Sequence, residues 1–237
     1  MVRGNPVNNN ADLAHDQQAA TNRMGSNYPE NPGKAGLGKR IHAWMLAHLN
    51  ARYEQMVAAR KRALFADLRG EILEIGPGTG PNLPYYSSGI HWIGIEPNPY
   101  MYPYLRNTAE RVGLRVDLRP ATAEQLPAEN GSMDAVVSTL VLCSVTDPQA
   151  VLQEIRRVLK PGGRFLFVEH VAAPPGTRLR RVQTMLRPVW KRIADGCHPD
   201  RETWIAIERA GFDRLDYEHF RLPLGPVATQ IAGCAVK

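Results

Sequence analysis

The chain has 237 residues, a length that fits one large domain or a domain with a tail. Its 29 Lys and Arg residues outnumber its 23 Asp and Glu residues, and the formal net charge is +6. These bases are not gathered in one long block, so the charge does not by itself indicate nucleic-acid binding, and we expect no nucleic-acid partner. The apolar fraction is sufficient for a sizeable core.

Cysteine usage and hydropathy predict a cytoplasmic protein without a metal. The three cysteines, Cys143, Cys197 and Cys234, lie far apart and form no Cys-x-x-Cys pair, which argues against a disulfide framework and a structural zinc site. No run approaches the roughly 20 apolar residues of a membrane span, and the N-terminus does not have the order of a signal peptide. The oligomeric state is left open.

The first segments in chain order are a flexible stretch and a helix. Residues 1–38 are rich in Asn, Gly and Pro, and we expect them to be flexible. Tyr28 is an aromatic within this stretch that could fold over a pocket, so it is a candidate substrate contact. Over residues 41–68 apolar side chains recur at helical spacing. This helix is expected to pack on a sheet edge or to cap a ligand site, within a single domain of residues 39–237.

Short apolar segments then alternate with helical ones. We predict strands at 71–75, 91–95, 115–119, 134–142 and 164–171, helices at 99–112 and 147–159, and a short helix or turn over 81–88. Asn98 is a suitable N-cap, and Pro161-Gly162-Gly163 should end the second helix. This alternation predicts a Rossmann-like, doubly wound α/β fold with a parallel sheet covered on both faces.

The rhythm changes after residue 171. A helix is expected over 178–193, where Pro188 should kink or split it, and another over 201–210. Two strands follow, around 214–219 and 228–236. Because nothing between these strands could form a long crossover, we expect them to be antiparallel. The prediction is therefore a mostly parallel seven-stranded sheet with an antiparallel C-terminal strand.

Three alternate glycines, Gly76, Gly78 and Gly80, follow the first strand. Glycine permits a sharp turn and a close approach of ligand to backbone, at the strand ends where open α/β sheets bind ligands. The Gly-x-Gly-x-Gly spacing differs from the dinucleotide pattern, which places a pyrophosphate at a helix N-terminus. Glu74, inside the same motif, would repel a pyrophosphate and could orient an ammonium group. S-adenosylmethionine, which has no phosphate, is therefore favoured as cofactor over NAD.

An acidic residue closes the second strand. Glu96 lies about 20 residues past the first glycine, as an acid that holds ribose hydroxyls should, and its carboxylate can accept both hydrogen bonds of a vicinal diol. The segment 121–127 lies beyond the third strand, where adenine is expected to rest. The other candidate cofactor contacts are Pro77, Pro97, Thr122, Ala123, Glu124, Thr139 and Leu140.

The run from residue 71 to 163 resembles the class I methyltransferases of the ubiquinone-biosynthesis type. The shared motifs are the glycine loop, the acid after the second strand, the Glu-Gln-Leu-Pro segment at 124–127, the apolar strand after Met133-Asp134, and the Leu-Lys-Pro-Gly-Gly turn at 159–163. The resemblance implies a methyltransferase that uses S-adenosylmethionine. One position departs from the pattern, since Thr122 stands where an Asp usually contacts the adenine amino group.

A closer resemblance extends over most of the chain from residue 71 onward. The segments Thr-Leu-Val-Leu-Cys-Ser-Val at 139–145, Glu-His-Val-Ala-Ala at 169–173, Asp-Gly-Cys at 195–197 and Arg-Glu-x-Trp at 201–204 are similar to those of the methyltransferase-like thiol methyltransferases of animal cells. This implies a thiol acceptor. Those relatives carry an apolar N-terminal membrane anchor, which we do not find here. A bacterial-type relative from secondary metabolism is our hypothesis for the origin.

Candidate acceptor contacts lie after the fourth and fifth strands. His170 ends the fifth strand, and the unperturbed pKa of histidine suits a general base; the alternative is a structural histidine. Asp195 is a second candidate base or a partner for a cationic acceptor. Cys143 and Cys197 could line the acceptor pocket or simply pack as small apolar groups. Trp204 could form an aromatic wall or belong to the core.

The sequence thus predicts methyl transfer from S-adenosylmethionine to a small-molecule acceptor, with a thiol as first choice. The alternative acceptor is carbon or nitrogen of a natural-product ring such as an indole or quinone, for which a base would matter more because thiols ionise easily. A cofactor-binding protein without catalysis is a rival class, but the intact glycines and Glu96 argue against it.

Overall fold

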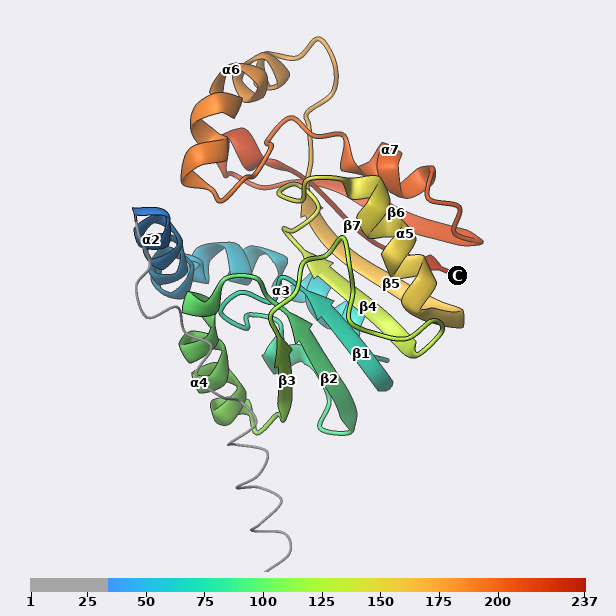
Figure 1. Cartoon of the computed structure of the whole chain (residues 1–237). Coiled ribbons are helices and arrows are strands. Elements are labelled where there is room, and N and C mark those ends of the chain that lie inside the picture. The colour runs from blue at the N-terminus through green and yellow to red at the C-terminus, as the bar shows by residue number, and fades with distance from the viewer. Residues whose placement is uncertain (1–33) are drawn as a thin grey trace, which may run out of the picture. The chain divides into compact units, whose positions relative to one another are not determined.

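The computed structural model describes residues 34–237, in which a central sheet carries helices on both faces (Figure 1). The seven strands are β1 (Gly70–Ile75), β2 (Ile90–Ile95), β3 (Val116–Arg119), β4 (Met133–Thr139), β5 (Leu159–His170), β6 (Arg214–Arg221) and β7 (Thr229–Val236). The helices are α2 (Lys34–Leu49), α3 (Ala51–Phe65), α4 (Tyr102–Val112), α5 (Pro148–Val158), α6 (Arg178–Ile193) and α7 (Thr203–Glu208). Short 3₁₀ turns lie at Leu83–Tyr85, Pro99–Met101 and Gly225–Val227.

The strand order is β3-β2-β1-β4-β5-β7-β6. Strands β1 to β5 pair in parallel, whereas β7 is antiparallel to both β5 and β6. The predicted fold class and the antiparallel final pair are confirmed. Since the chain moves outward from β1 to β3 and then returns to place β4 beside β1, the strand order reverses between β1 and β4. Ligands bind at such a switch point in open α/β sheets.

Alternating side chains of the strands bury against two helical layers. On β1, Leu73 and Ile75 pack with α5 and α7, whereas Ile72 packs with α4 and the end of α3. On β5, Phe165 and Phe167 join the first layer. Because successive strand residues point to opposite faces, a continuous apolar run such as that of β5 requires cover on both sides. This double cover explains why the central strands are almost uniformly apolar.

Several element boundaries differ from the sequence prediction. The predicted helix over 41–68 is two helices that meet at Asn50. Helix α2 begins at Lys34, inside the stretch 1–38 that was expected to be flexible. Strand β4 ends at Thr139, three residues early, because Leu140 has a positive φ of 58°. Strand β5 begins at Leu159, so the turn expected at 161–163 lies within it and shifts its register against β4. Pro188 does not split α6, which continues as one helix from Arg178 to Ile193.

Among residues 34–237, no helix combines the length and apolar character needed to cross a membrane.

Candidate active site

Two adjoining pockets lie at the carboxyl ends of β1, β2, β4 and β5. The Glu96 pocket, of about 280 Å³, is lined by residues that include Glu96, Thr122 and Val145. The His170 pocket, of about 390 Å³, includes His170 and Tyr53 among its walls. Residues common to both linings are His42, Leu46, Gly76, Gly78, Leu140 and Ser144. A ligand that extends along the glycine loop can therefore occupy both pockets.

The glycine loop has the backbone conformation that its sequence predicts. Gly76, Gly78 and Gly80 have φ values of 59°, 55° and 80°, in the region that favours glycine. A Cβ at Gly76 would lie 2.6 Å from a methyl of Val141, whereas a Cβ at Gly78 would meet no protein atom within 4 Å. Gly76, Pro77 and Gly78 line the His170 pocket. The first glycine is thus needed for packing, and the second leaves space for a ligand.

Gly80 has a different place from the one predicted. A Cβ at this position would lie 2.9 Å from Leu83 and 3.3 Å from Leu105, and the residue lines neither the Glu96 pocket nor the His170 pocket. Its absent side chain lets the loop pack on η1 and α4. The structure therefore does not place Gly80 in the lining of either pocket, although its conformation shapes the loop.

Glu96 is buried at the tip of β2, with 6% of its surface exposed. Its carboxylate accepts hydrogen bonds from the backbone N–H of Gly78 at 3.0 Å and of Asn98 at 2.8 Å. Burial raises its pKa from the ordinary value of 4.5 to about 7, although these two hydrogen bonds oppose the shift. Each oxygen retains lone-pair capacity for a further donor. The position therefore suits a carboxylate that binds hydroxyl groups.

The segment after β3 forms the far wall of the Glu96 pocket. Thr122, Ala123 and Glu124 all line it, as does Pro97. Glu124 accepts a hydrogen bond from the backbone N–H of Thr146 at 3.0 Å, which ties this segment to the loop after β4. Apolar side chains complete the wall at Ile95, Met101, Val141 and Val145, and sequence reasoning did not identify them.

Glu74 lies beneath the pockets and does not line either of them. It is 1% exposed, and its carboxylate accepts hydrogen bonds from Asn82 at 2.8 Å, Tyr86 at 2.7 Å and Trp92 at 3.0 Å. Burial raises its pKa. The Asn82 amide also donates to Thr139 at 3.0 Å. The structure therefore does not place the Glu74 side chain in either pocket, where an ammonium group was expected to meet it; the side chain points into the protein and positions Asn82.

The turn after β4 forms a wall that the two pockets share. Leu140 lines both pockets and has the positive φ noted above, a conformation uncommon for a residue with a Cβ. Its N–H donates to the carbonyl of Val168 at 3.0 Å. Buried Glu169 fixes the same turn, since its carboxylate accepts from Ser138 at 2.6 Å and from the N–H of Val141 at 3.1 Å. Sequence reasoning placed Glu169 only as the neighbour of His170.

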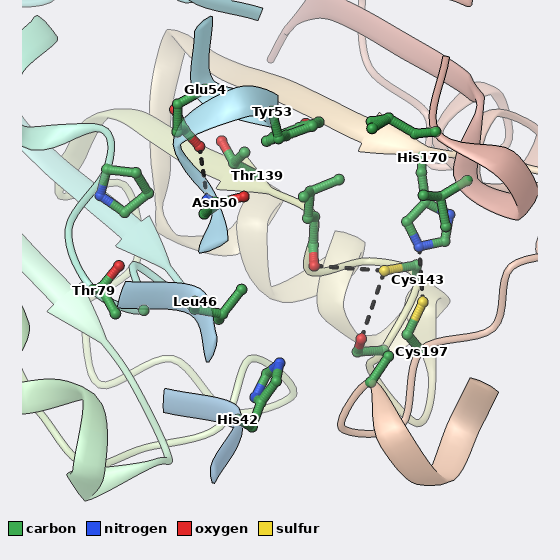
Figure 2. Close-up of a pocket in the computed structure, with 18 of the residues that line it drawn as sticks. His42, Leu46, Asn50, Tyr53, Glu54, Thr79, Thr139, Cys143, His170 and Cys197 are labelled. Carbon is green, nitrogen blue, oxygen red and sulfur yellow. Dashed lines mark hydrogen bonds between the residues drawn. The ribbon is translucent and has the colours of Figure 1, made fainter. Parts of the chain in front are cut away.

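Cys143, His170 and Cys197 gather at one end of the His170 pocket, opposite Thr79 of the glycine loop (Figure 2). The distance between Nε2 of His170 and Sγ of Cys197 is 2.8 Å, and Trp190 donates its indole N–H to the same sulfur at 3.2 Å. A hydrogen bond with Cys197, together with burial, raises the pKa of Cys143 well above its ordinary value. Three of the predicted acceptor contacts are thus brought together in space.

Two other predicted residues lie elsewhere, and one is outside the described residues. Asp195 lines the Glu96 pocket, where it lies 3.7 Å from His42, and it is not in the lining of the His170 pocket. Trp204 lines a separate cavity beside β6, where it makes an edge contact with His219. It is therefore not a wall of the His170 pocket. Tyr28 lies before residue 34, outside the described part of the chain.

Helix α2 and the start of α3 supply pocket residues that sequence reasoning did not name. His42 and Leu46 line both pockets. Tyr53 lines the His170 pocket and donates to Gln230, another residue of its lining, at 3.4 Å. The sequence predicted that this region packs on a sheet edge or caps a ligand site, and these positions agree with the second alternative. The apolar spacing of residues 41–68 was the available signal, but it does not distinguish a face that packs from a face that lines a cavity.

These observations fit S-adenosylmethionine. The open space at Gly78, the adjoining pocket of about 280 Å³ and the remaining acceptor capacity of Glu96 suit a nucleoside with a free diol. When bound, this cofactor supplies a methyl group on a cationic sulfur, which is open to attack by a nucleophile. The strand order and the site at its switch point together define the class I methyltransferases that use S-adenosylmethionine.

Comparisons with known proteins agree, and the chain belongs to this methyltransferase family. A family model described as a methyltransferase domain matches residues 73–167. Thiol S-methyltransferase TMT1B of Rattus norvegicus is 41% identical over 212 residues, which cover 84% of this chain and 87% of that protein. Thiol S-methyltransferase TMT1A of Homo sapiens is 38% identical over the same shares of the two chains. A ubiquinone biosynthesis O-methyltransferase of Cereibacter sphaeroides is 36% identical over 192 residues, or 76% of each chain.

Solved structures share the fold at lower identity. A SAM-dependent methyltransferase from Aquifex aeolicus superposes with a TM-score of 0.57 at 16% identity, covering 83% of this chain and 97% of that one. The [4+2]-cyclase SpnF superposes with a TM-score of 0.60 at 22% identity, covering 78% of this chain and 80% of that one. Since one of these two is named as a cyclase, the fold alone does not specify the acceptor.

Proposed function

We propose that this enzyme transfers the methyl group of S-adenosylmethionine to the sulfur of a small-molecule thiol. The observation that carries the proposal is the identity of about 40% with proteins named as thiol S-methyltransferases, over most of both chains. The identity extends beyond the family model at 73–167, so it includes acceptor-side segments outside that model. The ubiquinone biosynthesis O-methyltransferase covers less of the chain, at 76%.

In this proposal the two pockets divide the cofactor and the acceptor between them. Glu96 accepts hydrogen bonds from the ribose hydroxyls, and the segment of Thr122 to Glu124 with its apolar neighbours holds the adenine. The glycine loop, Thr139 and Leu140 surround the methionine end. The methyl group then faces the His170 pocket. Holding the donor methyl and the acceptor sulfur in line converts a bimolecular step into an effectively unimolecular one.

The walls of the His170 pocket support a soft, uncharged acceptor. Apolar side chains contribute much of the lining, among them Leu46, Leu224, Val227 and Trp190. An aliphatic or aryl thiol buries its apolar part in such a pocket at about 25 cal/mol per Å² removed from water. The thiol must lose its proton to attack, because the thiolate is the nucleophile. His170 lines this pocket beside Cys197, and we assign to it the task of favouring that ionisation.

A substrate panel tests this function. Purified protein and S-adenosylmethionine are offered alkyl thiols, aryl thiols, phenols, indoles, quinols and amines, and S-adenosylhomocysteine release is measured. We expect release with thiols and none with the other classes. His170→Gln should lower turnover on thiols, whereas His198→Gln, whose side chain is in neither pocket lining, should retain it. Release with an indole or quinol while thiols remain inert would refute the thiol assignment and leave the cofactor assignment intact.

A further inference from the structure

The cluster of Cys143, His170 and Cys197 has the composition of a metal site. The three residues are 1%, 4% and 5% exposed, and one potential ligand atom from each lies within 4.8 Å of the other two. They come from three separate places in the fold: the turn after β4, the last residue of β5 and the loop after α6 (Figure 2). Neither sulfur is joined in a disulfide.

The spacing of these atoms is close to that of a tetrahedral zinc site. Zinc binds sulfur at about 2.3 Å and imidazole nitrogen at about 2.0–2.1 Å, which separates tetrahedral ligand atoms by roughly 3.6–3.8 Å. The distance between Nε2 of His170 and Sγ of Cys197 is 2.8 Å, and the largest separation in the cluster does not exceed 4.8 Å. Shifts of about 1 Å in side-chain positions bring all three atoms to zinc distance.

Backbone contacts hold the two cysteine segments together. The N–H of His198 donates to the carbonyl of Cys143 at 2.9 Å. Arg201 donates to the carbonyls of Leu142 and Val145, both at 2.7 Å. These bonds fix the loop after α6 against the turn after β4, so the two sulfurs face each other before any ion binds. A preorganised ligand set of this kind binds metal without first ordering the chain.

The surroundings of the cluster resemble those of a bound thiolate. The Trp190 indole donates its N–H to Sγ of Cys197 at 3.2 Å, and such donors around ligating atoms tune metal sites. Nδ1 of His170 is buried and makes no hydrogen bond within the described residues. All three candidate ligands also line the His170 pocket, so a fourth coordination position opens into the space assigned to the acceptor. Three protein ligands with one open position are typical of catalytic zinc, including the Cys₂His set.

We propose that Cys143, His170 and Cys197 bind one zinc ion whose open position receives the acceptor sulfur. The metal site stands on its own geometry, and only its use for a thiol rests on the proposed function. Zinc binding displaces one proton from each cysteine, and the two thiolates neutralise the dication. An acceptor R–SH that binds at the open position releases its proton to solvent, because a coordinated thiol is deprotonated. His170 then acts as a ligand, which replaces the base role expected from sequence.

The transfer step balances without a further reactant. The coordinated sulfur attacks the methyl carbon, a new S–CH₃ bond forms, and the bond from that carbon to the sulfonium breaks. The electron pair of the broken bond remains on the sulfur of S-adenosylhomocysteine. The methylated product is a neutral thioether, a weaker zinc ligand than the thiolate it replaces, so it leaves the open position.

Metal analysis of the full chain tests the proposal directly. Protein purified without chelator and dialysed against zinc should retain about one zinc per chain, and replacement by Co²⁺ should give a sulfur-to-cobalt charge-transfer band with visible absorption of tetrahedral cobalt. Cys143→Ala and Cys197→Ala should each lose this band. Cys234→Ala, which removes the cysteine outside the cluster, should retain it. Trp190→Phe should bind zinc about 10- to 100-fold more weakly.

Binding of S-adenosylmethionine by each variant controls for misfolding, because Glu96 and the glycine loop are not part of the cluster. Substoichiometric zinc with no thiolate–cobalt band in the wild-type chain would overturn the proposal, and so would a Cys143–Cys197 disulfide in peptides from the chain purified and dialysed with zinc. Equal metal loss in Cys234→Ala and Cys143→Ala would also overturn it. Stoichiometric zinc without thiol turnover would reject the proposed function while the metal site stands. Thiol turnover by a metal-free chain would reject the proposed metal site while the proposed function stands.

Discussion

The raised pKa of Glu96 leads to a prediction about cofactor affinity and pH. The carboxyl has a pKa of about 7 in the free protein. Its ionised form is an acceptor at both oxygens and suits two ribose hydroxyls, whereas protonation turns one oxygen into a donor. About one tenth of the protein is therefore ready to bind at a pH one unit below this value. From about pH 6 to about pH 8 the affinity for S-adenosylmethionine should rise close to tenfold, or about 1.4 kcal/mol.

Ionisation of Glu96, which favours cofactor binding, lowers the stability of the free protein. Since the pKa is raised in the folded state, the neutral carboxyl is favoured by folding. Its contribution is fully present below about 4.5, the ordinary value, and is lost as the pH rises through about 7. The loss is at most roughly 3 kcal/mol, from a shift of about 2.5 units at 1.36 kcal/mol each. Glu96→Gln should reduce this pH dependence and weaken cofactor binding by about 1.5–3 kcal/mol, the typical value of a hydrogen bond to a charged group.

Calorimetry is the assay for this prediction. Titration of S-adenosylmethionine at several pH values gives the affinity, and repetition in buffers of different ionisation enthalpy gives the protons released. We expect release of nearly one proton at about pH 6 and very little at about pH 8. Glu124→Gln, which alters another acid of the same pocket, is a control that should keep the pH profile. A flat affinity across this range, or an unchanged profile in Glu96→Gln, would refute the reasoning.

Two further predictions use matched substitutions. Gly76→Ala should destabilise the fold by more than about 1–2 kcal/mol, because its Cβ would meet Val141 at 2.6 Å in addition to the cost of a left-handed conformation. Gly78→Ala should have only the conformational cost, but it should lose cofactor affinity. Thermal melts measure the stabilities and calorimetry the affinities, and equal melting of the two variants would contradict this prediction. Trp190→Phe should change the KM or the turnover for the acceptor, because Trp190 lines the His170 pocket. Trp204→Phe should leave both quantities unchanged, because Trp204 lies in a separate cavity. Equal kinetic effects of the two substitutions would contradict this placement.

The layered fold was accessible from sequence because its signals are local. Strand and helix positions follow from apolar periodicity, and the N-cap at Asn98 and the end of α5 follow from residue type. The same holds for the position of the cofactor site, since the glycine loop and Glu96 lie at the ends of consecutive strands that pair in register. The break at Asn50 was missed because apolar spacing continues across it, and the end of β4 was missed because no residue type signals the positive φ of Leu140.

The amino-acid sequence by itself determined the fold class, the methyltransferase motifs and the acid at the tip of β2, because these depend on neighbours along the chain. Only the tertiary structure decided which side chains face a cavity. It turned Glu74 inward, moved Asp195 to the Glu96 pocket and put Trp204 in another cavity. It also brought together Cys143 and Cys197, whose distance along the chain had argued against a metal site. Contacts between distant segments depend on how loops close over the sheet, and periodicity along one segment does not encode that closure.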